Sequence, residues 1–190
     1  MKFLHAWFLI CFAWVAALQG ASKSLYEKGG GFAPDERVLY KKAFGKKEKL
    51  AEELHLEFFY PDGFAKTDSR PSIVFFSGGG WTGGDTSQFY AQAKYLASRG
   101  MLAICAQYRR ALKTAKPVWC VEDARSGVRY LRKHASALGL DPKRIAAGGG
   151  SAGGHLAAAT ATISAFDWPD DDLTVSAVPN ALVLFNPVFD

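Results

Sequence analysis

Residues 143–163 read KRIAAGGGSAGGHLAAATATI. A short apolar run, Ile145 to Ala147, leads into a glycine-rich centre, and an alanine-rich run with helical character follows it. This order predicts a strand, a tight turn and a helix. Within the turn, residues 149–153 match G-x-S-x-G, which in that setting is typical of a nucleophile elbow. The pattern therefore predicts that Ser151 stands on a sharp corner at the start of a helix, where amides favour developing negative charge.

Four glycines, at positions 149, 150, 153 and 154, surround Ser151. We expect them to leave room for a strained serine backbone in a crowded turn. The alternatives are a glycine-rich turn with an incidental serine, a phosphate cradle, or a nucleotide-binding turn. The nucleotide reading needs G-x-G-x-x-G near the first strand and an acidic residue about 20 positions later. Here the glycines lie late in the chain, and the acidic residues 170–172 fall in a proline-containing loop.

A second glycine cluster supports the elbow. Residues 73–76 form a fully apolar run, typical of a strand covered on both faces, and Ser77-Gly78-Gly79-Gly80-Trp81 follows at once. Successive glycines let backbone N–H groups turn toward a ligand, as in the oxyanion hole of an acyl-transfer enzyme. We therefore expect Gly79 and Gly80, with the amide of Ala152, to be the oxyanion donors. The alternative is a flexible glycine turn.

The rest of the chain alternates between strand and helix patterns. A hairpin is expected at 38–44 and 54–60, a helix at 86–98 capped by Asp85, a buried strand at 102–106, a long helix ending at Gly139, a turn at 141–142, an acidic loop at 167–172 and an apolar strand at 181–185. Apolar strands alternating with helices predict the α/β class, with a mostly parallel sheet covered on both faces.

The first 20 residues have the pattern of a secretory signal, with Lys2 followed by an apolar run from Phe3 to Leu18 and then small residues. The alternative is an N-terminal membrane anchor, although the run is shorter than the roughly 20 residues that a membrane span needs. We expect a signal peptide at 1–20, a lead-in at 21–36 and one partial α/β domain at 37–190. This pattern predicts a secreted or periplasmic protein with no other membrane segment.

The chain has 190 residues and a formal net charge of +5, to which lysines 41, 42, 46, 47 and 49 contribute much. Such a run is usually a solvated face or hairpin loop, and no nucleic-acid motif accompanies it. We expect no nucleic-acid partner. The three cysteines form no metal spacing, and Cys105 and Cys120 are left either paired or free. No cofactor is expected.

Taken together, these motifs resemble the α/β-hydrolase superfamily, in its hormone-sensitive-lipase-like and carbohydrate (acetyl xylan, feruloyl) esterase branch. The resemblance covers about residues 54–190. It rests on the loop at 77–81, on VEDA to LR at 121–132, on GLDPKRI at 139–145 and on GGSAGGH at 149–155. It implies an α/β-hydrolase sheet, Ser151 as nucleophile and the oxyanion donors named above.

Two departures from that pattern are evident. Ser77 stands where the family usually has histidine, which affects the bracing of the loop. The family's acid and histidine normally follow the serine at a distance, whereas here no histidine comes after His155. His155 lies one helical turn past Ser151, and we expect its ring to point along the helix rather than toward the serine. We therefore expect a C-terminally truncated chain, with the sheet incomplete at that end.

These features predict a serine esterase whose substrate is a small acyl ester or an acylated polysaccharide. Serine is a weak nucleophile without a base, so we expect the activity of this chain to be impaired. The alternative is a non-catalytic hydrolase-fold scaffold that binds a carbohydrate or a protein partner.

Overall fold

The computed structural model describes residues 31–44, 51–111 and 116–189. The expected signal peptide, and the lead-in as far as residue 30, lie outside these ranges. The elements are β1 (Glu36–Phe44), β2 (Ala51–Phe59), β3 (Arg70–Phe76), the 3₁₀ turn η2 (Thr86–Phe89), α2 (Tyr90–Ser98), β4 (Leu102–Ala106), α3 (Pro117–Lys133), β5 (Leu140–Gly150), α4 (Ala152–Thr162) and β6 (Ala181–Phe185). None of the helices in these ranges is long and apolar enough to cross a membrane.

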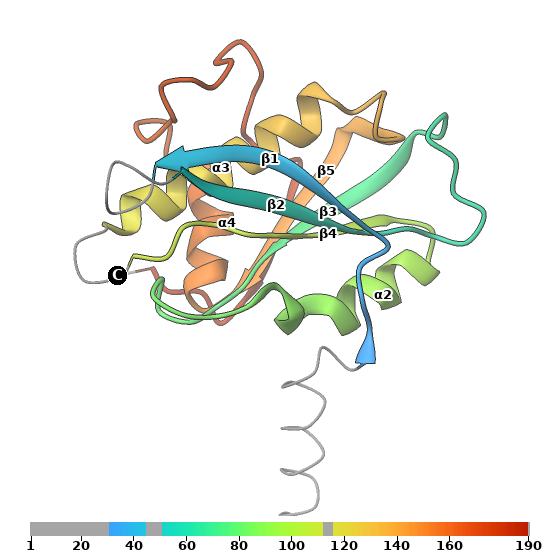
Figure 1. Cartoon of the computed structure of the whole chain (residues 1–190), viewed down its shortest axis with the longest axis horizontal. Coiled ribbons are helices and arrows are strands. Elements are labelled where there is room, and N and C mark those ends of the chain that lie inside the picture. Colours follow the sequence, from blue (N-terminus) through green and yellow to red (C-terminus); the bar gives the residue numbers. More distant parts are fainter. Residues whose placement is uncertain (1–30, 45–50, 112–115, 190) are drawn as a thin grey trace, which may run out of the picture.

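The strands form one sheet in the order β1-β2-β4-β3-β5-β6 (Figure 1). Strands β4, β3, β5 and β6 are parallel, whereas β1 and β2 form an antiparallel hairpin that pairs with β4 at one side. The predicted mostly parallel α/β sheet and the edge hairpin are both confirmed. The carboxyl ends of β3 and β5 are register neighbours, with Phe76 opposite Gly149. This pairing brings the two glycine-rich segments to the same edge of the sheet.

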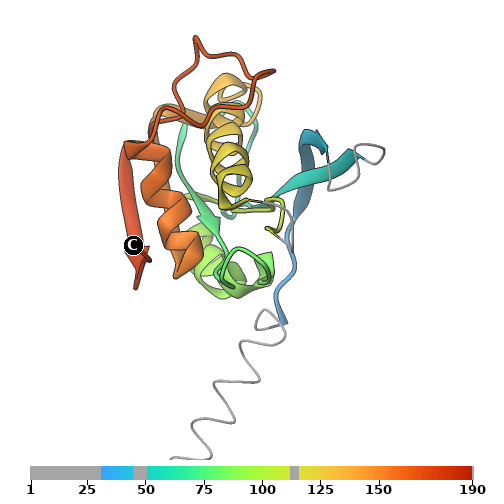
Figure 2. The same cartoon turned by 90° about the vertical axis from the view of Figure 1, so that its left-hand side faces the viewer.

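Helices cover both faces of the central strands (Figure 2). Alternate residues of β3 point to opposite sides, so Val74 and Phe76 join the core beneath α3 and α4, while Ile73 and Phe75 join a second core beneath α2. The two-sided burial predicted for residues 73–76 is confirmed. Strand β6 differs, because most of its side chains are exposed.

The helix boundaries depart from the sequence prediction in two places. The helix expected at 86–98 begins as the 3₁₀ turn η2, and Asp85 accepts a hydrogen bond from the amide of Ser87 before α2 starts at Tyr90. The long helix ends at Lys133 rather than Gly139, because the chain turns tightly after His134. The turn expected at 141–142 is not a separate turn: these residues lie inside β5, where the pairing with β3 skips residues 141–144.

The lysine run does not form a solvated face throughout. Lys41 is buried, and its ammonium group lies 2.7 Å from the carboxylate of Asp123, which is wholly buried in α3. Burial lowers the pKa of Lys41 even though the Asp123 charge opposes that shift. Arg109 approaches the same carboxylate, with Nε 2.8 Å from Oδ2. A carboxylate with two cationic partners thus ties the hairpin and the segment after β4 to α3. Lysines 46, 47 and 49 lie outside the described residues.

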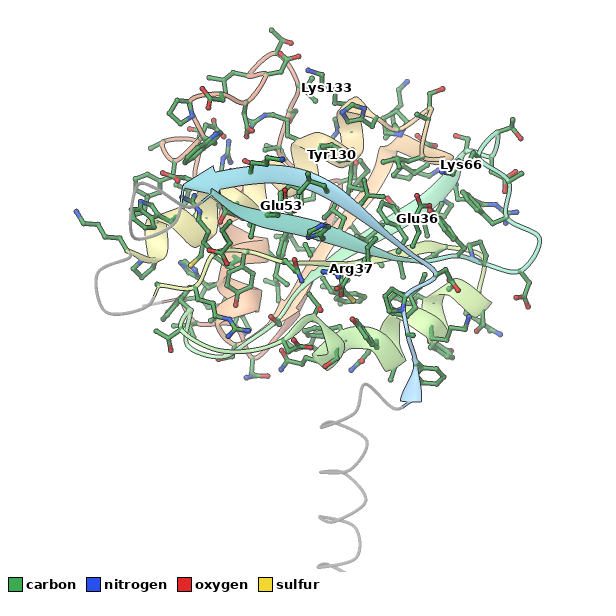
Figure 3. The ribbon with its side chains drawn as sticks, viewed as in Figure 1. Glu36, Arg37, Glu53, Lys66, Tyr130 and Lys133 are labelled. Carbon is green, nitrogen blue, oxygen red and sulfur yellow. The ribbon has the colours of Figure 1, made fainter. Side chains whose placement is uncertain are left out.

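The acidic loop at 167–172 also packs onto α3. Arg125 and Arg129 both bond to Asp167, and Arg129 reaches Asp171 at 2.7 Å. At the end of the helix, Lys133 pairs with the exposed carboxylate of Asp172 at 3.0 Å (Figure 3 labels Lys133). The prediction of a polar loop is confirmed. The carboxylates of this loop hold it against α3.

Both cysteines of the described ranges, Cys105 and Cys120, are free and buried. Burial raises the pKa of the Cys120 thiol to about 12 and places that of Cys105 well above its ordinary value. Both thiols are therefore protonated and unreactive at neutral pH.

We expect Asp123→Asn to lower the free energy of unfolding by about 3–5 kcal/mol, because it removes the counter-charge of the buried Lys41 and leaves Arg109 with Glu122 as its carboxylate partner. Urea unfolding followed by circular dichroism measures the change. Lys42→Ala is the matched control, since Lys42 forms an exposed pair with Glu53 on the same hairpin. That control is expected to cost less than about 1 kcal/mol. Equal losses in the two variants would contradict a special role for the buried carboxylate.

Acid should weaken the docking of the 167–172 loop. Hydrogen bonds from Thr174 and Lys133 lower the pKa of Asp172 from 3.8 to about 2. The folded protein therefore takes up this proton less readily than the unfolded chain. The stabilising contribution of Asp172 is complete above pH 3.8 and is lost as the pH falls toward 2.

We therefore expect Asp172→Asn to lower the unfolding free energy near neutral pH, with the difference from wild type shrinking between pH 3.8 and 2. Urea titrations across this range measure it. Asp170→Asn is the control, because Asp170 is exposed in the same loop and pairs with no described residue. A difference that is independent of pH would contradict the assignment to the carboxylate's charge.

Candidate active site

Ser151 stands on a strained corner between β5 and α4. Its backbone has φ 53° and ψ −120°, a conformation that residues with a side chain rarely adopt. The neighbouring elements hold this corner in place: the amide of Ser151 donates to the carbonyl of Phe185 at 3.0 Å, and its carbonyl accepts from the amide of His155 at 3.0 Å. The sharp strand–turn–helix geometry predicted from the sequence is confirmed.

Three of the four glycines around Ser151 are required by space. A Cβ on Gly153 would lie 2.0 Å from the carbonyl oxygen of Phe76, and one on Gly149 would lie 2.4 Å from the carbonyl oxygen of Gly153. A Cβ on Gly154 would come within 2.9 Å of Pro187. Gly150 is different, since the nearest atom to its Cβ would be 3.5 Å away on Phe89. The expectation that position 150 also needs glycine for room is wrong, because the chain there faces a loose aromatic contact.

The triple-glycine loop lies directly against this corner. A Cβ on Gly78 would be 2.8 Å from the carbonyl oxygen of Gly150 and 3.4 Å from Cβ of Ser151. The loop then turns through three successive residues with positive φ: Gly79 at 131°, Gly80 at 59° and Trp81 at 61°. Its tightest point is at Gly84, where a Cβ would lie 1.8 Å from the carbonyl oxygen of Gly78. The glycine loop therefore extends from the predicted residues 77–81 to Gly84. The glycine pair at 83 and 84 could have indicated this longer loop from the sequence.

The amides of the loop differ in their partners. The N–H of Gly78 donates to the side-chain carbonyl of Gln88 at 2.5 Å. Within the described ranges the N–H groups of Gly79 and Gly80 have no hydrogen-bond acceptor. Ala152 opens α4, so its amide has no carbonyl one turn earlier to bond. The three amides named from the sequence are thus available as donors, and Gln88, which fixes the loop beside them, had no signal in the sequence.

A cleft of about 770 Å³ opens at Ser151. It is lined by Gly78, Gly79, Gly84, Asp85, Ser87, Gln88, Phe89, Gln92, Gly150, Ser151, Phe185 and Asn186. Ser151 and Gly79 therefore face one space, whereas Gly80 lies outside its lining. Asn186, just past β6, has a φ of 37° and adds a polar side chain to the wall.

His155 lies one helical turn past Ser151 but does not hydrogen-bond to its hydroxyl. His155 packs edge-on to Trp81, with ring centroids 5.4 Å apart at 86°. Burial lowers the pKa of His155, so its ring is neutral at pH 7. His55 lies in β2, which pairs with both β1 and β4, and the ring of His134 packs at a tilt against Tyr130. No histidine of the described ranges hydrogen-bonds to Ser151 Oγ.

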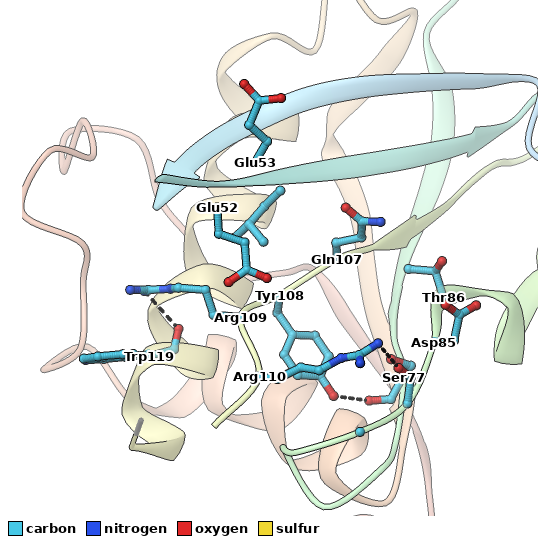
Figure 4. A pocket seen from close by; sticks show the side chains of 13 residues that line it. Glu52, Glu53, Ser77, Asp85, Thr86, Gln107, Tyr108, Arg109, Arg110 and Trp119 are labelled. Carbon is cyan, nitrogen blue, oxygen red and sulfur yellow. Dashed lines mark hydrogen bonds between the residues drawn. The ribbon is translucent and has the colours of Figure 1, made fainter. Parts of the chain in front are cut away.

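A second cavity, of about 440 Å³, lies on the other side of the glycine loop (Figure 4). Its lining mixes apolar and aromatic residues with polar ones, among them Glu52, Gln107 and Arg110. The hydroxyl of Tyr108 donates to the carbonyl of Ser77 at 2.7 Å, and Arg110 donates to the carbonyl of Gly84 at 2.8 Å. These bonds tie the loop, at the buried Ser77 and at Gly84, to the segment after β4.

The described residues contain no group of three or more His, Cys, Asp or Glu side chains arranged to hold a metal ion. At the corner, Ser151 lies at the start of α4, and the amides of Gly79 and Gly80 in the neighbouring loop have no hydrogen-bond acceptor among the described residues.

Comparison with known proteins agrees with this geometry. A family profile described as BD-FAE matches residues 56–180. Among curated proteins, carboxylesterase NlhH of Mycobacterium tuberculosis is 33% identical over 99 residues, which are 51% of this chain and 30% of that protein. The carboxylic ester hydrolase LipN of the same species is 36% identical over 110 residues, 57% of this chain and 28% of that protein. The chain thus matches about 30% of the length of these curated relatives.

Solved structures extend the likeness. The apo form of Thermogutta terrifontis esterase 2 is 44% identical, with a TM-score of 0.75, and the match covers 81% of this chain and 56% of that one. The same esterase phosphonylated by cyclosarin is 43% identical, with a TM-score of 0.75 and the same coverage. The chain therefore spans just over half of the esterase chain.

We expect Gly153→Ala to destabilise the fold by about 1–3 kcal/mol or more, because the added methyl group meets a main-chain oxygen that cannot move aside. Gly150→Ala is the matched control on the same corner, since its methyl group meets only van der Waals contacts. Urea unfolding of both variants measures the difference. Similar stabilities would contradict the close approach of α4 to β3.

Proposed function

The chain belongs to the BD-FAE family of the α/β-hydrolase superfamily, and on that basis we propose that it carries the nucleophile and oxyanion half of a serine carboxylesterase site. The supporting observation is that the strained Ser151 and Gly79, whose amide is unpaired, line one cleft, and that Ala152 follows Ser151 at the start of α4. Relatives of similar sequence are named as carboxylic ester hydrolases. The activity of the whole protein belongs to this proposal.

In the proposed reaction, the Ser151 oxygen attacks the carbonyl carbon of an ester and the π electrons move to the carbonyl oxygen. The amides of Gly79, Gly80 and Ala152 donate hydrogen bonds to that oxyanion, and the dipole of α4 favours its charge. With no base among the described residues, water accepts the Ser151 proton during the attack. Collapse of the tetrahedral intermediate breaks the bond to the alcohol oxygen, which takes up a proton from water, and leaves an acyl group on Ser151. Water then releases the acid.

The hydroxyl proton of Ser151 needs an acceptor during the attack. His155 faces Trp81 instead, and none of the described histidines bonds to the hydroxyl. The proposal therefore assigns the nucleophile and the oxyanion donors to the described residues, and it assigns the general base to none of them. Hydrolysis by this chain alone is then impaired, because serine without a base is a weak nucleophile.

The proposed substrate is a small acyl ester or an acyl group carried on a polysaccharide. The apolar wall formed by Phe89 and Phe185 beside Ser151 suits an acyl chain. The cavity beyond the glycine loop, with Glu52, Gln107 and Arg110, suits a polyhydroxylated alcohol. Secretion through the pattern of residues 1–20 is consistent with a polysaccharide substrate, and we include a secreted or periplasmic location in the proposal.

A fluorophosphonate probe tests the proposal on the full chain. We expect one covalent adduct, located by mass spectrometry on the peptide that contains Ser151, and its loss in Ser151→Ala. Turnover of p-nitrophenyl acetate should exceed the rate in water by no more than about 10³–10⁴-fold, which is the residual catalysis of an oxyanion hole without a complete triad.

Ser98→Ala is the control, because Ser98 is an exposed serine away from the elbow and its hydroxyl donates to the carbonyl of Tyr95. It should keep the adduct. A folded wild-type chain that takes up no probe would favour the non-catalytic scaffold, and labelling that survives Ser151→Ala would remove Ser151 from the mechanism.

A further inference from the structure

Trp81 occupies a costly backbone conformation. It has a side chain, yet its φ of 61° lies in the left-handed region, directly after Gly79 and Gly80, which also have positive φ. A residue other than glycine in this region costs about 1–3 kcal/mol and persists only where its surroundings fix it. The contacts of Trp81 therefore decide where the two preceding amides point.

Trp81 packs against the main hydrophobic core, and two further contacts fix its position. Its carbonyl accepts a hydrogen bond of 2.7 Å from the amide of Ala111, which fixes the outgoing end of the loop. Its ring meets the ring of His155 edge-on at 5.4 Å, which fixes the side chain against α4. His155 in turn donates its own amide to the carbonyl of Ser151. One residue thus contacts both the corner and the loop.

The two rings meet by packing rather than by a hydrogen bond. Nδ1 of His155 and Nε1 of Trp81 are both buried, and neither has a hydrogen-bond partner in the described part of the chain. A buried polar atom without a hydrogen-bond partner lowers the stability of the fold. An apolar side chain of similar shape at position 155 would therefore be more stable than His155, so stability alone does not account for this pair. The lowered pKa of His155 keeps the ring uncharged at neutral pH, as this dry contact requires.

We propose that His155 is a positioning residue for the glycine loop: its ring holds Trp81, and through the main chain of Trp81 it holds the amides of Gly79 and Gly80 toward Ser151. This inference rests on the proposed function, because only an oxyanion needs those amides in place. The proposal gives His155 a role other than that of general base.

Hydrogen exchange tests the positioning without requiring activity. In His155→Ala we expect the amides of residues 78–83 to exchange about three- to tenfold faster, the effect of losing one aromatic edge contact. Strand β4 should be unchanged. His155→Phe keeps a ring at the same place and should restore slow exchange. Because it removes a buried unpaired polar atom, it should also fold at least as stably as wild type.

Labelling by a fluorophosphonate under excess reagent gives the second readout. In His155→Ala the maximal rate constant should fall about ten- to hundredfold, because misplaced donors are lost from the transition state. The half-saturating reagent concentration should change less than about twofold, since the cleft itself remains. Trp81→Ala should show the same loss, and the double variant should add nothing further.

His134→Ala is the matched control, because His134 is also partly buried and also packs on an aromatic ring, Tyr130, away from the loop. It should alter neither readout. Unchanged exchange of residues 78–83 in His155→Ala would overturn the positioning role. If the amides exchange faster in His155→Ala but Ser151 of the wild-type chain never labels, the proposed function is refuted, whereas the positioning role of His155 is supported.

Discussion

The close approach of α4 to the end of β3 is the constraint on which the site depends. The helix begins so near the sheet that the carbonyl oxygen of Phe76 occupies the space of a Cβ on Gly153. A helix this close can start only from a corner, and Ser151 makes that corner with a positive φ. The strain at Ser151 is therefore a consequence of packing, held by hydrogen bonds to Phe185 and His155.

The pairing of β3 with β5 determines which groups lie beside Ser151. Because β3 and β5 are parallel neighbours, the loop after β3 and the corner after β5 emerge at the same sheet edge. Gly78 can lie against the carbonyl group of Gly150 only because Gly78 has no side chain. The amide of Gly78 donates to Gln88, whereas the amides of Gly79 and Gly80 have no acceptor among the described residues. Parallel pairing and missing side chains thus produce a row of donors beside a hydroxyl.

The sequence predicted what local pattern controls. Strands 102–106 and 181–185 were placed at their observed bounds because each is a short apolar run between polar turns. The elbow was predicted because its glycines, strand and helix are contiguous. Contacts between distant segments were not predictable: Lys41 looked like part of a solvated run, yet it is buried against Asp123, 82 positions later in the sequence (123 − 41 = 82). Helix ends were also missed, since the turn after His134 keeps the apolar spacing of the helix before it.

The buried ion network explains how a small sheet can hold a strained corner. Asp123 binds cations from the hairpin and from the segment after β4, and the ring of Trp168 lies over both, 4.2 Å from Lys41 and 4.9 Å from Arg109. Trp168 belongs to the loop that leads from α4 toward β6. The network therefore fixes α3 to the segments on either side of it, and α3 packs on α4. Since Ser151 begins α4, its corner can relax only if this layer moves, and a buried, charge-paired layer resists that movement.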